Sequence, residues 1–290
     1  MILTNETIKK LLPSRKKNAN KGDFGKVAIV GGCTEFAGAP YLATKAALKS
    51  GAGYTTLFVP EGLVGAYLLK APEATLEKIS DGTSLSFCEQ YFEKLLNYDA
   101  IAFGMGAKNT ADTLSAVTYL LETYEGKLLL DADALNALST LAGGKKRTLF
   151  SRKKCDVLLT PHIKEFSRLT GKTVKALTEN GLAAATAFAW DHFGVTVLLK
   201  GAATYITDGK REAENQTGTP AQAKGGSGDL LSGLCAGLMA TGLDCFSAGC
   251  VGSFLAGRAA ELAVETTGEY SLLASDVIDK LGAAFLSVQA

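Results

Sequence analysis

The chain has 290 residues, 47% of them hydrophobic, which is enough for a sizeable core in one large α/β domain or two small ones. Thirty Lys and Arg residues against twenty-nine Asp and Glu residues give a net charge of +1. A charge so close to zero gives no electrostatic reason to expect a nucleic acid or an anionic membrane as partner. Three basic clusters without interleaved aromatic residues are interpreted as solvated surface: Arg15-Lys16-Lys17, Lys145-Lys146-Arg147 and Arg152-Lys153-Lys154.

Short apolar strands alternate with longer helical patterns along almost the whole chain, which predicts an α/β fold with a mostly parallel sheet and helices on both faces. Strands are predicted at 27–30, 54–59, 100–103, 128–131, 157–160 and 195–199. Helices are predicted at 40–50, 110–123, 164–170, 182–192, 230–240 and 247–264, with another beginning at Ala134. No structureless linker or repeat divides the chain, so residues 1–290 are expected to form a single domain.

The turn pair Asp208-Gly209 lies between two short segments with strand character, 205–207 and 212–214. This pattern predicts an antiparallel hairpin after the strand that begins at Val195. The hairpin would lead the chain back towards a glycine-rich loop.

Polar and glycine residues directly follow five of the predicted strands. They are Gly31-Gly32, Gly104-Met105-Gly106, Asp131-Ala132-Asp133, Thr160-Pro161-His162 and Lys200-Gly201. Because parallel strands end at one edge of their sheet and ligands bind at that edge, we expect these segments to line a common site.

The six cysteines contain no CxxC pair, and several lie in apolar runs, which indicates reduced thiols and a cytoplasmic protein. Only two histidines are present and no Cys/His cluster accompanies them, so a structural zinc site is not expected and any metal should be bound by oxygen atoms. The N-terminus lacks the apolar core of a signal peptide, and Asp244 interrupts the longest uncharged run. The sequence therefore predicts a soluble protein that is not exported.

The segment Gly225-Gly226-Ser227-Gly228-Asp229 runs directly into a helical pattern rich in small apolar residues. Its glycines allow positive φ and close approach of a ligand to the backbone, and the free N–H groups of the helix that follows would attract a phosphate. Asp229 can be interpreted in two ways, as a base that faces the phosphate or as a cap of the helix, since carboxylates are favoured at helix N-termini.

Lys200 closes an apolar strand, where its ammonium needs an anionic partner such as a phosphate, although a lysine at a sheet edge is an equal alternative. The glycines around the first strand lack the G-x-G-x-x-G spacing and no acidic residue marks a ribose, which disfavours ordinary dinucleotide binding. A P-loop is absent as well, because Gly143-Gly144-Lys145 lacks the preceding spacing and is interpreted as part of a basic loop.

Four further residues have both a functional and a structural interpretation. Asp131 and Asp133 are either a functional carboxylate pair or helix caps, and capping is preferred for Asp133. His162 is either a ligand contact or a hydrogen-bonded turn residue. Glu165 could hold Mg²⁺ through water near a phosphate, or could simply stabilise the first turn of a helix.

The ordered set of these motifs resembles the ADP/ATP-dependent NAD(P)H-hydrate dehydratases over roughly residues 20 to 287. The resemblance is carried by 21–26, Gly31-Gly32, 51–53, 131–136, 160–162 with Glu165-Phe166, Lys200-Gly201, 215–218 and 225–229. It implies a ribokinase-like three-layer fold. The chain departs from the family pattern at Ser227, which replaces a threonine, and at Met105, Ile163-Lys164 and Gln216, where prolines are usual.

The resemblance also implies site residues. It assigns the hydrated dinucleotide to Ala39, Gly106, His162 and Asp229, and the phosphoryl donor to Lys200, Gly201, Ala202, Ala203, Thr204, Asn215 and Gly228. Asp229 would be the catalytic base, with Gly226 and Gly228 of the loop as further catalytic groups. Mg²⁺ is an implied cofactor, and a homo-oligomer, often a tetramer, is the implied assembly. The epimerase domain that often accompanies this family is not expected in the chain.

The implied reaction is a metabolite repair. A hydro-lyase of this kind converts (S)-NADHX or NADPHX, the hydrated forms of NADH and NADPH, back to NADH or NADPH. Phosphoryl transfer from ADP or ATP drives the reaction and releases AMP or ADP and phosphate. The alternative is a ribokinase-like kinase for a vitamin precursor or sugar, which would use the same loop, lysine and aspartate. A catalytically silent nucleotide-binding protein is a third interpretation, although such a protein has no need of a carboxylate beside a phosphate.

Overall fold

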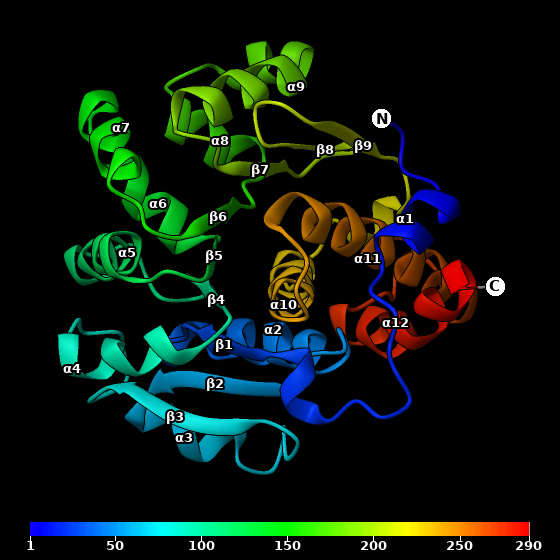
Figure 1. Ribbon diagram of the computed structural model, residues 1–290, viewed down its shortest axis with the longest axis horizontal. Helices are drawn as coiled ribbons and strands as arrows, with labels where there is room; N and C mark the ends of the chain where they lie inside the picture. The colour runs from blue at the N-terminus through cyan, green and yellow to red at the C-terminus, as the bar shows by residue number, and fades with distance from the viewer. Residues whose placement is uncertain (290) are drawn as a thin grey trace.

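The computed structural model describes residues 1–289, which form a nine-stranded sheet between two helical layers (Figure 1). The strands are β1 (Lys26–Val30), β2 (Tyr54–Pro60), β3 (Thr75–Ser80), β4 (Ala100–Phe103), β5 (Lys127–Leu130), β6 (Asp156–Leu159), β7 (Thr196–Leu199), β8 (Thr204–Thr207) and β9 (Glu212–Asn215). Their order is β3-β2-β1-β4-β5-β6-β7-β8-β9. The strands from β3 to β7 are parallel, and β8 and β9 complete the sheet as an antiparallel hairpin.

Alternate residues of each central strand enter two separate apolar cores. In β1, Val27 and Ile29 pack on one face of the sheet while Ala28 and Val30 pack on the other. This alternation follows from the two-residue period of a strand, and continuous apolar runs arise because a parallel sheet is buried on both faces. The fold is therefore the predicted three-layer α/β arrangement.

The helices divide between the two faces (Figure 1). One face is covered by α1 (Asn5–Leu11), α2 (Gly38–Leu48), α3 (Glu61–Tyr67), α10 (Ser227–Ala240), α11 (Cys245–Thr267) and α12 (Ala274–Gln289). The other is covered by α4 (Glu89–Phe92), α5 (Ala111–Thr123), α6 (Asp133–Ser139), α7 (Gly143–Ser151), α8 (Ile163–Thr170) and α9 (Val174–Asp191). Short 3-10 helices occupy Lys21–Phe24, Thr34–Phe36, Glu93–Asn97 and Pro220–Gln222.

All six predicted strands and the predicted hairpin are confirmed, with ends that shift by one residue at most. The edge strand β3 was not predicted, because Glu77 and Lys78 interrupt any apolar run there. Helix α9 begins eight residues earlier than expected: a kink at Asn180 (φ −136°, ψ 38°) separates its first turns from the predicted segment. Helix α12 was missed as well, although its buried residues recur at helical spacing.

The interpretation of 143–145 as a basic loop is wrong, since these residues begin α7. Nor is the whole Lys145-Lys146-Arg147 cluster solvated. Lys146 is 3% exposed and its ammonium donates a hydrogen bond to the carbonyl of Leu169 at the end of α8. Burial lowers the pKa of this lysine. The helix period rotates Lys146 inward while its two basic neighbours face solvent.

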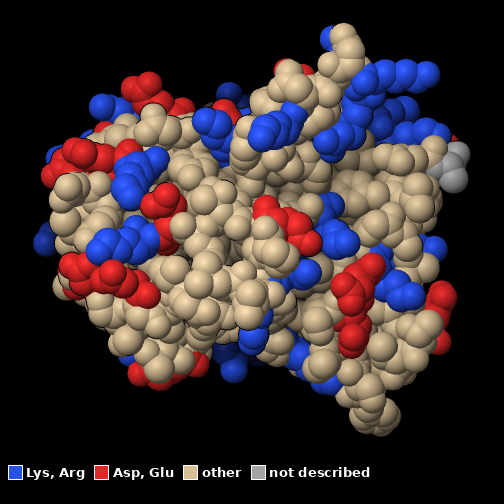
Figure 2. Space-filling model, turned by 90° about the horizontal axis from the view of Figure 1, so that it is seen from below, with Lys and Arg blue, Asp and Glu red and all other residues tan. Residues whose placement is uncertain are grey.

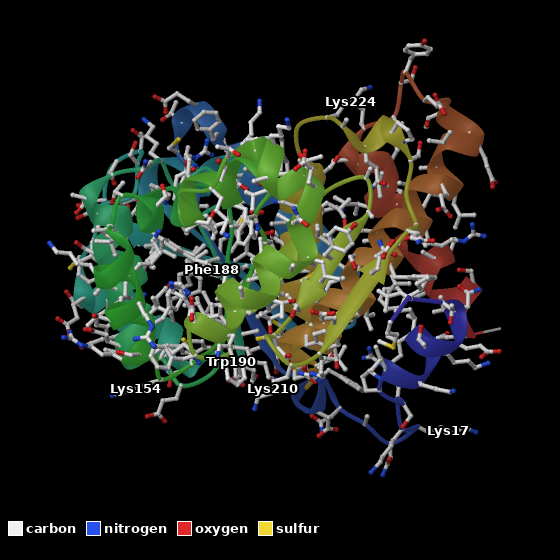
Figure 3. The ribbon with its side chains drawn as sticks, turned by 90° about the horizontal axis from the view of Figure 1, so that it is seen from above. Lys17, Lys154, Phe188, Trp190, Lys210 and Lys224 are labelled. Atoms are coloured by element: carbon white, nitrogen blue, oxygen red, sulfur yellow. The ribbon has the colours of Figure 1, made fainter. Side chains whose placement is uncertain are left out.

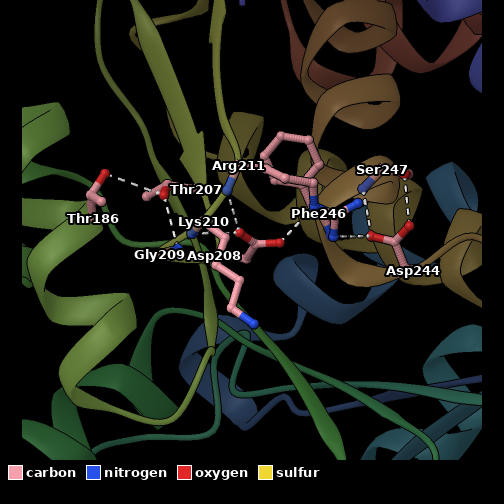
Figure 4. A network of polar contacts seen from close by, with 9 residues as sticks. All are labelled: Thr186, Thr207, Asp208, Gly209, Lys210, Arg211, Asp244, Phe246 and Ser247. Atoms are coloured by element: carbon pink, nitrogen blue, oxygen red, sulfur yellow. Dashed lines mark hydrogen bonds and ion pairs between the residues drawn. The ribbon is translucent and has the colours of Figure 1, made fainter.

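The hairpin turn is held against helix α11 by a polar network (Figure 4). Asp208 accepts hydrogen bonds from the backbone of Lys210 and Arg211 and from the Arg211 guanidinium, at 2.7 to 2.9 Å. That guanidinium also donates to Asp244, the N-cap of α11, at 3.0 Å. The turn lies at the opposite end of β8 from Thr204.

The surface has charges of both signs spread over it. On the face seen in Figure 2, acidic and basic side chains alternate over most of the area, and basic ones gather at one upper corner. Figure 3 shows Lys154, Trp190 and Lys210 along the edge opposite Lys224. No helix within residues 1–289 is long and apolar enough to cross a membrane.

Candidate active site

A cavity of about 790 Å³ opens where the ends of β6 and β7 meet the start of α10. Six of the seven residues predicted to bind the phosphoryl donor line it: Lys200, Gly201, Ala202, Thr204, Asn215 and Gly228. Ala203 is not among the lining residues. His162 of the predicted substrate set also lines this cavity. The convergence of strand ends predicted from the sequence is thus confirmed for β6 and β7.

The glycine loop enters α10 through Gly226, which has φ 97° and is the N-cap of the helix. This positive φ favours glycine at Gly226, and a β-carbon there would also come within 2.6 Å of Leu42 Cδ1. The first N–H groups of a helix have no intrahelical acceptor. Here the Ser227 N–H donates a long, 3.5 Å hydrogen bond to the Lys224 carbonyl, whereas the Gly228 N–H has no acceptor within residues 1–289 and borders the cavity. The loop therefore offers backbone donors to an anion in the cavity.

Asp229 is the third residue of α10 and does not cap it. Within residues 1–289 no group hydrogen-bonds to its carboxylate, so the capping interpretation is wrong. Burial raises the pKa of Asp229 to about 6, and the nearby carboxylates of Asp131 and Asp133 raise it further against the opposing effect of Lys200. A carboxylate without partners and with a pKa near neutrality can act as a general base.

Lys200 is anchored by Asp131, whose carboxylate oxygen Oδ1 lies 2.9 Å from the lysine Nζ. Burial by itself would lower the pKa of Lys200, but the charges of Asp131 and Glu165 outweigh it and raise that pKa. The ammonium also lies beside the glycine loop, because a β-carbon at Gly228 would be 3.2 Å from it. Lys200 therefore remains charged at the point where the loop N–H groups face the cavity.

A second wall is formed by the loops after β1, β4 and β5. A β-carbon at Gly106 (φ 68°) would come within 2.7 Å of the Phe36 carbonyl and 3.5 Å of Ala39 Cβ, so the predicted substrate residues Ala39 and Gly106 lie side by side. The lining of the 790 Å³ cavity does not include either of them or Asp229. Of the predicted substrate residues, only His162 therefore lines the donor cavity.

The predicted capping role of Asp133 is wrong. Helix α6 begins at Asp133 itself, and its Oδ2 accepts the backbone N–H of Lys108 at 2.8 Å, which joins the loop after β4 to the loop after β5. Between the two aspartates, Ala132 has φ 48° and ψ −113°, a conformation rarely adopted by a residue with a side chain. Strain of this kind clusters at functional sites, where the surrounding structure holds it in place.

His162 and Glu165 form a capping box at the start of α8. His162 Nδ1 accepts the N–H groups of Lys164 and Glu165 at 3.1 and 3.2 Å, and Glu165 Oε2 accepts the His162 N–H at 2.8 Å. Burial and the charge of Lys200 lower the pKa of His162, whereas burial raises that of Glu165 to about 6. His162 thus combines a structural role with a place in the cavity wall.

A dedicated metal site is not found. Within the described part of the chain, no three His, Cys, Asp or Glu side chains are arranged to hold a metal ion. Glu165 is 6% exposed and one of its oxygens already accepts the His162 N–H, so it fits direct coordination poorly. A magnesium ion held mainly by phosphates and water needs only one or two carboxylates nearby, which leaves the water-mediated role of Glu165 as a proposal.

Sequence reasoning missed two neighbours of these residues, Ser232 and Lys224. Ser232 donates a hydrogen bond to Asp131 Oδ2 at 2.6 Å, and Thr160 lies 3.4 Å from Ser232. Lys224 lines the cavity and donates to the carbonyl of Tyr270. The position of Ser232, three residues after Asp229 on the same helix, was the one available signal.

A model of the NAD(P)H-hydrate dehydratase family matches residues 27–282. The chain is 35% identical over 286 residues to the bifunctional NAD(P)H-hydrate repair enzyme Nnr of Moorella thermoacetica, which covers 97% of this chain and 53% of that protein. It is 32% identical over 271 residues to the ADP-dependent (S)-NAD(P)H-hydrate dehydratase of Cenarchaeum symbiosum, with 91% of this chain and 89% of that protein covered. The chain spans about half the length of the bifunctional relatives.

Solved structures agree with these sequence relationships. The ADP/ATP-dependent NAD(P)H-hydrate dehydratase of Bacillus subtilis, crystallised with ATP and Mg²⁺, superimposes with a TM-score of 0.84 at 29% identity and covers 98% of this chain and 97% of that chain. A hydroxyethylthiazole kinase from Pyrococcus horikoshii, at 17% identity and TM-score 0.56 over 83% of this chain and 92% of its own, shares the fold alone. The chain belongs to the NAD(P)H-hydrate dehydratase family, with the ribokinase-like fold.

Proposed function

We propose that this chain repairs hydrated NADH or NADPH, in the (S) form, by phosphoryl transfer from ADP or ATP. The observation that carries the proposal is the Asp229 carboxylate, which has no hydrogen-bond partner within residues 1–289 and a pKa raised to about 6 beside the glycine loop. A pure binding protein gains nothing from an unpaired carboxylate next to a phosphate, whereas a phosphoryl-transfer enzyme needs a base there.

Asp229 would accept the proton of the substrate hydroxyl as that oxygen attacks the terminal phosphorus of the donor. The bond from phosphorus to the bridging oxygen breaks, and AMP leaves from ADP or ADP from ATP. General-base assistance of this kind contributes about 10²- to 10⁴-fold in rate. The phosphorylated hydroxyl is a good leaving group, so the ring nitrogen lone pair expels phosphate, and loss of a ring proton restores the reduced nicotinamide.

The glycine loop and Lys200 would stabilise the charge on the transferred group. The Gly228 N–H and the Lys200 ammonium lie close together at the cavity, and such fixed donors supply most of the stabilisation in phosphoryl transfer. We assign the remainder of the donor to the predicted residues Gly201, Ala202, Ala203, Thr204 and Asn215. When bound, Mg²⁺ would offset the phosphate charges, with Glu165 as its contact through water.

The hydrated nicotinamide would bind at the wall formed by Ala39 and Gly106, with His162 between this wall and the donor cavity. Support comes from the close approach of Gly106 to Ala39 and from the exposed His162 imidazole, which lines the donor cavity. We further propose that residues 1–290 act as one cytoplasmic domain in a homo-oligomer such as a tetramer. Six free cysteines, five of them buried, support the cytoplasmic assignment.

One experiment tests the reaction and separates it from the kinase alternative, whose fold is that of a hydroxyethylthiazole kinase and an adenosine kinase. Hydrated NADH is incubated with the protein and ADP or ATP, and the absorbance of reduced nicotinamide and the release of phosphate are followed together. Repair predicts equal amounts of both products. A stable phosphorylated compound without reduced nicotinamide would establish the kinase instead.

A further inference from the structure

A buried polar network of Asp131, Lys200 and Ser232 lies near Asp229, the proposed catalytic base. Both oxygens of Asp131, which is 2% exposed, are occupied: Oδ1 by the Lys200 ammonium at 2.9 Å and Oδ2 by the Ser232 hydroxyl at 2.6 Å. A buried carboxylate with two donors of this kind is held in one orientation. Asp131 is therefore rigid, in contrast to Asp229, which has no hydrogen-bond partner within residues 1–289.

The network connects three elements through hydroxyl groups. Ser232 lies three residues after Asp229 on α10, so both residues face the strand ends on the same side of that helix. The Ser232 hydroxyl is 3.4 Å from that of Thr160, which follows β6 and is 3.4 Å from the carbonyl of Leu130 in β5. Ser232 and Thr160 are fully buried. The helix that carries the base is thus tied to the strand ends that carry Asp131.

Lys200 is directed by this network. Its ammonium lies beside Gly228, the residue before Asp229, close enough that a β-carbon there would be 3.2 Å from Nζ and 3.8 Å from Asp131 Oδ2. A lysine has a flexible four-carbon stem and positions a point charge only if something fixes it. In the described residues Asp131 is the group that hydrogen-bonds to this ammonium.

The ion pair between Asp131 and Lys200 also determines the net charge close to the Asp229 carboxylate. The charges of Asp131 at the end of β5, Asp133 in α6 and Lys200 at the end of β7 act on Asp229. Glu165 and His162 at the start of α8 interact in turn with the charge of Lys200. An unpaired ammonium would favour the ionised form of Asp229 and weaken it as a base. Asp131 offsets that charge while it leaves Lys200 able to reach a phosphate.

We propose, on the basis of the proposed function, that Asp131 is the positioning residue of this site. Its carboxylate, oriented by Ser232, holds the Lys200 ammonium beside Gly228 at the start of α10. Asp131 itself touches no substrate. It acts through Lys200. The hydrogen bond from Ser232, which lies on the same helix as Asp229, fixes the orientation of the Asp131 carboxylate.

The first test is Asp131→Asn, which is nearly isosteric and keeps an acceptor for Lys200 while it removes the charge. We expect kcat to fall at least about tenfold, because part of the general-base contribution is lost. The donor KM should stay equal or fall, since a negative charge near the phosphates has gone. The acid limb of the pH profile should move down by about one pH unit. The charge of Lys200 is then no longer offset by Asp131, and it lowers the pKa of Asp229.

A merely structural role predicts the reverse pattern: a lower Tm, a raised KM and an unmoved acid limb. Asp208→Asn is the matched control, because it removes the carboxylate from a 2.7 Å contact with a basic side chain in the hairpin turn, away from the cavity (Figure 4). It should leave kcat, KM and the acid limb unchanged.

The second test is Ser232→Ala, which frees Asp131 Oδ2 and leaves every charge in place. We expect a severalfold lower kcat with the acid limb where it was. No such loss is expected in Ser80→Ala, a buried serine in β3 whose hydroxyl donates to the carbonyl of Ser84. This variant keeps the inference testable if Asp131→Asn does not fold. Unchanged kcat in Ser232→Ala would overturn the orienting role of Ser232.

Calorimetric titration with ADP across pH separates this inference from the proposed function, because it needs no turnover. ADP affinity of the wild-type protein should rise as the pH falls through the Asp229 pKa, and in Asp131→Asn that rise should occur at lower pH. If the wild-type protein does not repair hydrated NADH but the titration behaves so, the proposed function fails and the positioning role stands. If repair is normal in the wild type and Asp131→Asn matches it in kcat, KM and pH profile, the positioning role is overturned.

Discussion

Lys200 Nζ and the Cα of Gly228 lie so close that a β-carbon at Gly228 would be 3.2 Å from the ammonium. The space between them is where the loop N–H groups and the lysine charge act on the same anion. Gly228→Ala should therefore keep the fold, since the lysine end can move aside, and should weaken ADP and ATP binding at least about tenfold, equivalent to about 1.4 kcal/mol. Calorimetric titration measures this. The interpretation of the cavity as a phosphate site fails if the variant binds either nucleotide as tightly as the wild type.

Nucleotide binding should stabilise the protein. ADP or ATP with Mg²⁺ at a hundred times its dissociation constant should add about 2.7 kcal/mol to the free energy of unfolding, which is readily seen as a rise in Tm. Lys200→Met should abolish most of that rise, because the cavity loses the cation at its phosphate end. A melting temperature that millimolar nucleotide does not change would contradict the donor assignment.

Asp229→Asn should separate catalysis from binding. The variant loses the base but no hydrogen bond, because none is made to the Asp229 carboxylate within residues 1–289. Turnover should fall at least about a hundredfold, and ADP affinity should hold or improve, since one charge near the phosphates is removed. Near-normal repair by this variant would show that another group acts as the base.

The same substitution has a pH signature in stability. Burial raises the pKa of Asp229 to about 6 in the fold, above the usual value of 3.8 for an aspartate, so the folded state disfavours the ionised carboxylate. The wild type therefore loses stability relative to Asp229→Asn as the pH rises through that interval. Asp229→Asn should melt higher than the wild type at pH 8, and the difference should vanish below pH 4. Thermal melts of both proteins across this range measure it, and equal Tm values at pH 8 would contradict the raised pKa.

His162 needs a variant that preserves its capping role. Its Nδ1 accepts two N–H groups at the start of α8, so His162→Ala should cost about 1 kcal/mol of stability as well as any function. Asparagine is a good N-cap residue, and His162→Asn should restore the Tm. If His162 contacts the hydrated dinucleotide, His162→Asn should still raise the KM for that substrate more than the KM for ADP or ATP. If both variants changed the KM for the hydrated dinucleotide and the KM for ADP or ATP equally, His162 would have a structural role alone.

The strands and the glycine loop could be predicted because their signals are local. A strand buried on both faces of a parallel sheet must be apolar along its length, and each predicted strand was found by that property. The hairpin followed from Asp208-Gly209, and the order of motifs along the chain indicated the family. Helix α12 carried a helical pattern that was overlooked, whereas β3 offered no apolar run, since Glu77 and Lys78 lie within it.

The roles of the charged residues could not be predicted in the same way. From the sequence alone, Asp229 and Asp133 both fitted helix caps, yet Asp229 makes no cap hydrogen bond and Asp133 binds the N–H of Lys108. Lys146 belonged to a basic cluster and is buried nonetheless. Whether such a residue caps a helix, pairs with a charge or remains free depends on neighbours from distant parts of the chain.

By itself the sequence determined the layered α/β architecture and the position of the glycine loop before α10, because apolar period, glycine and turn chemistry act over a few residues. Only the tertiary structure decided that Asp131 holds Lys200, 69 residues away, and receives the Ser232 hydroxyl, 101 residues away. Those contacts arise where strand ends and the start of a helix converge. The Asp131 carboxylate has fixed partners there, whereas burial raises the pKa of Asp229 to about 6.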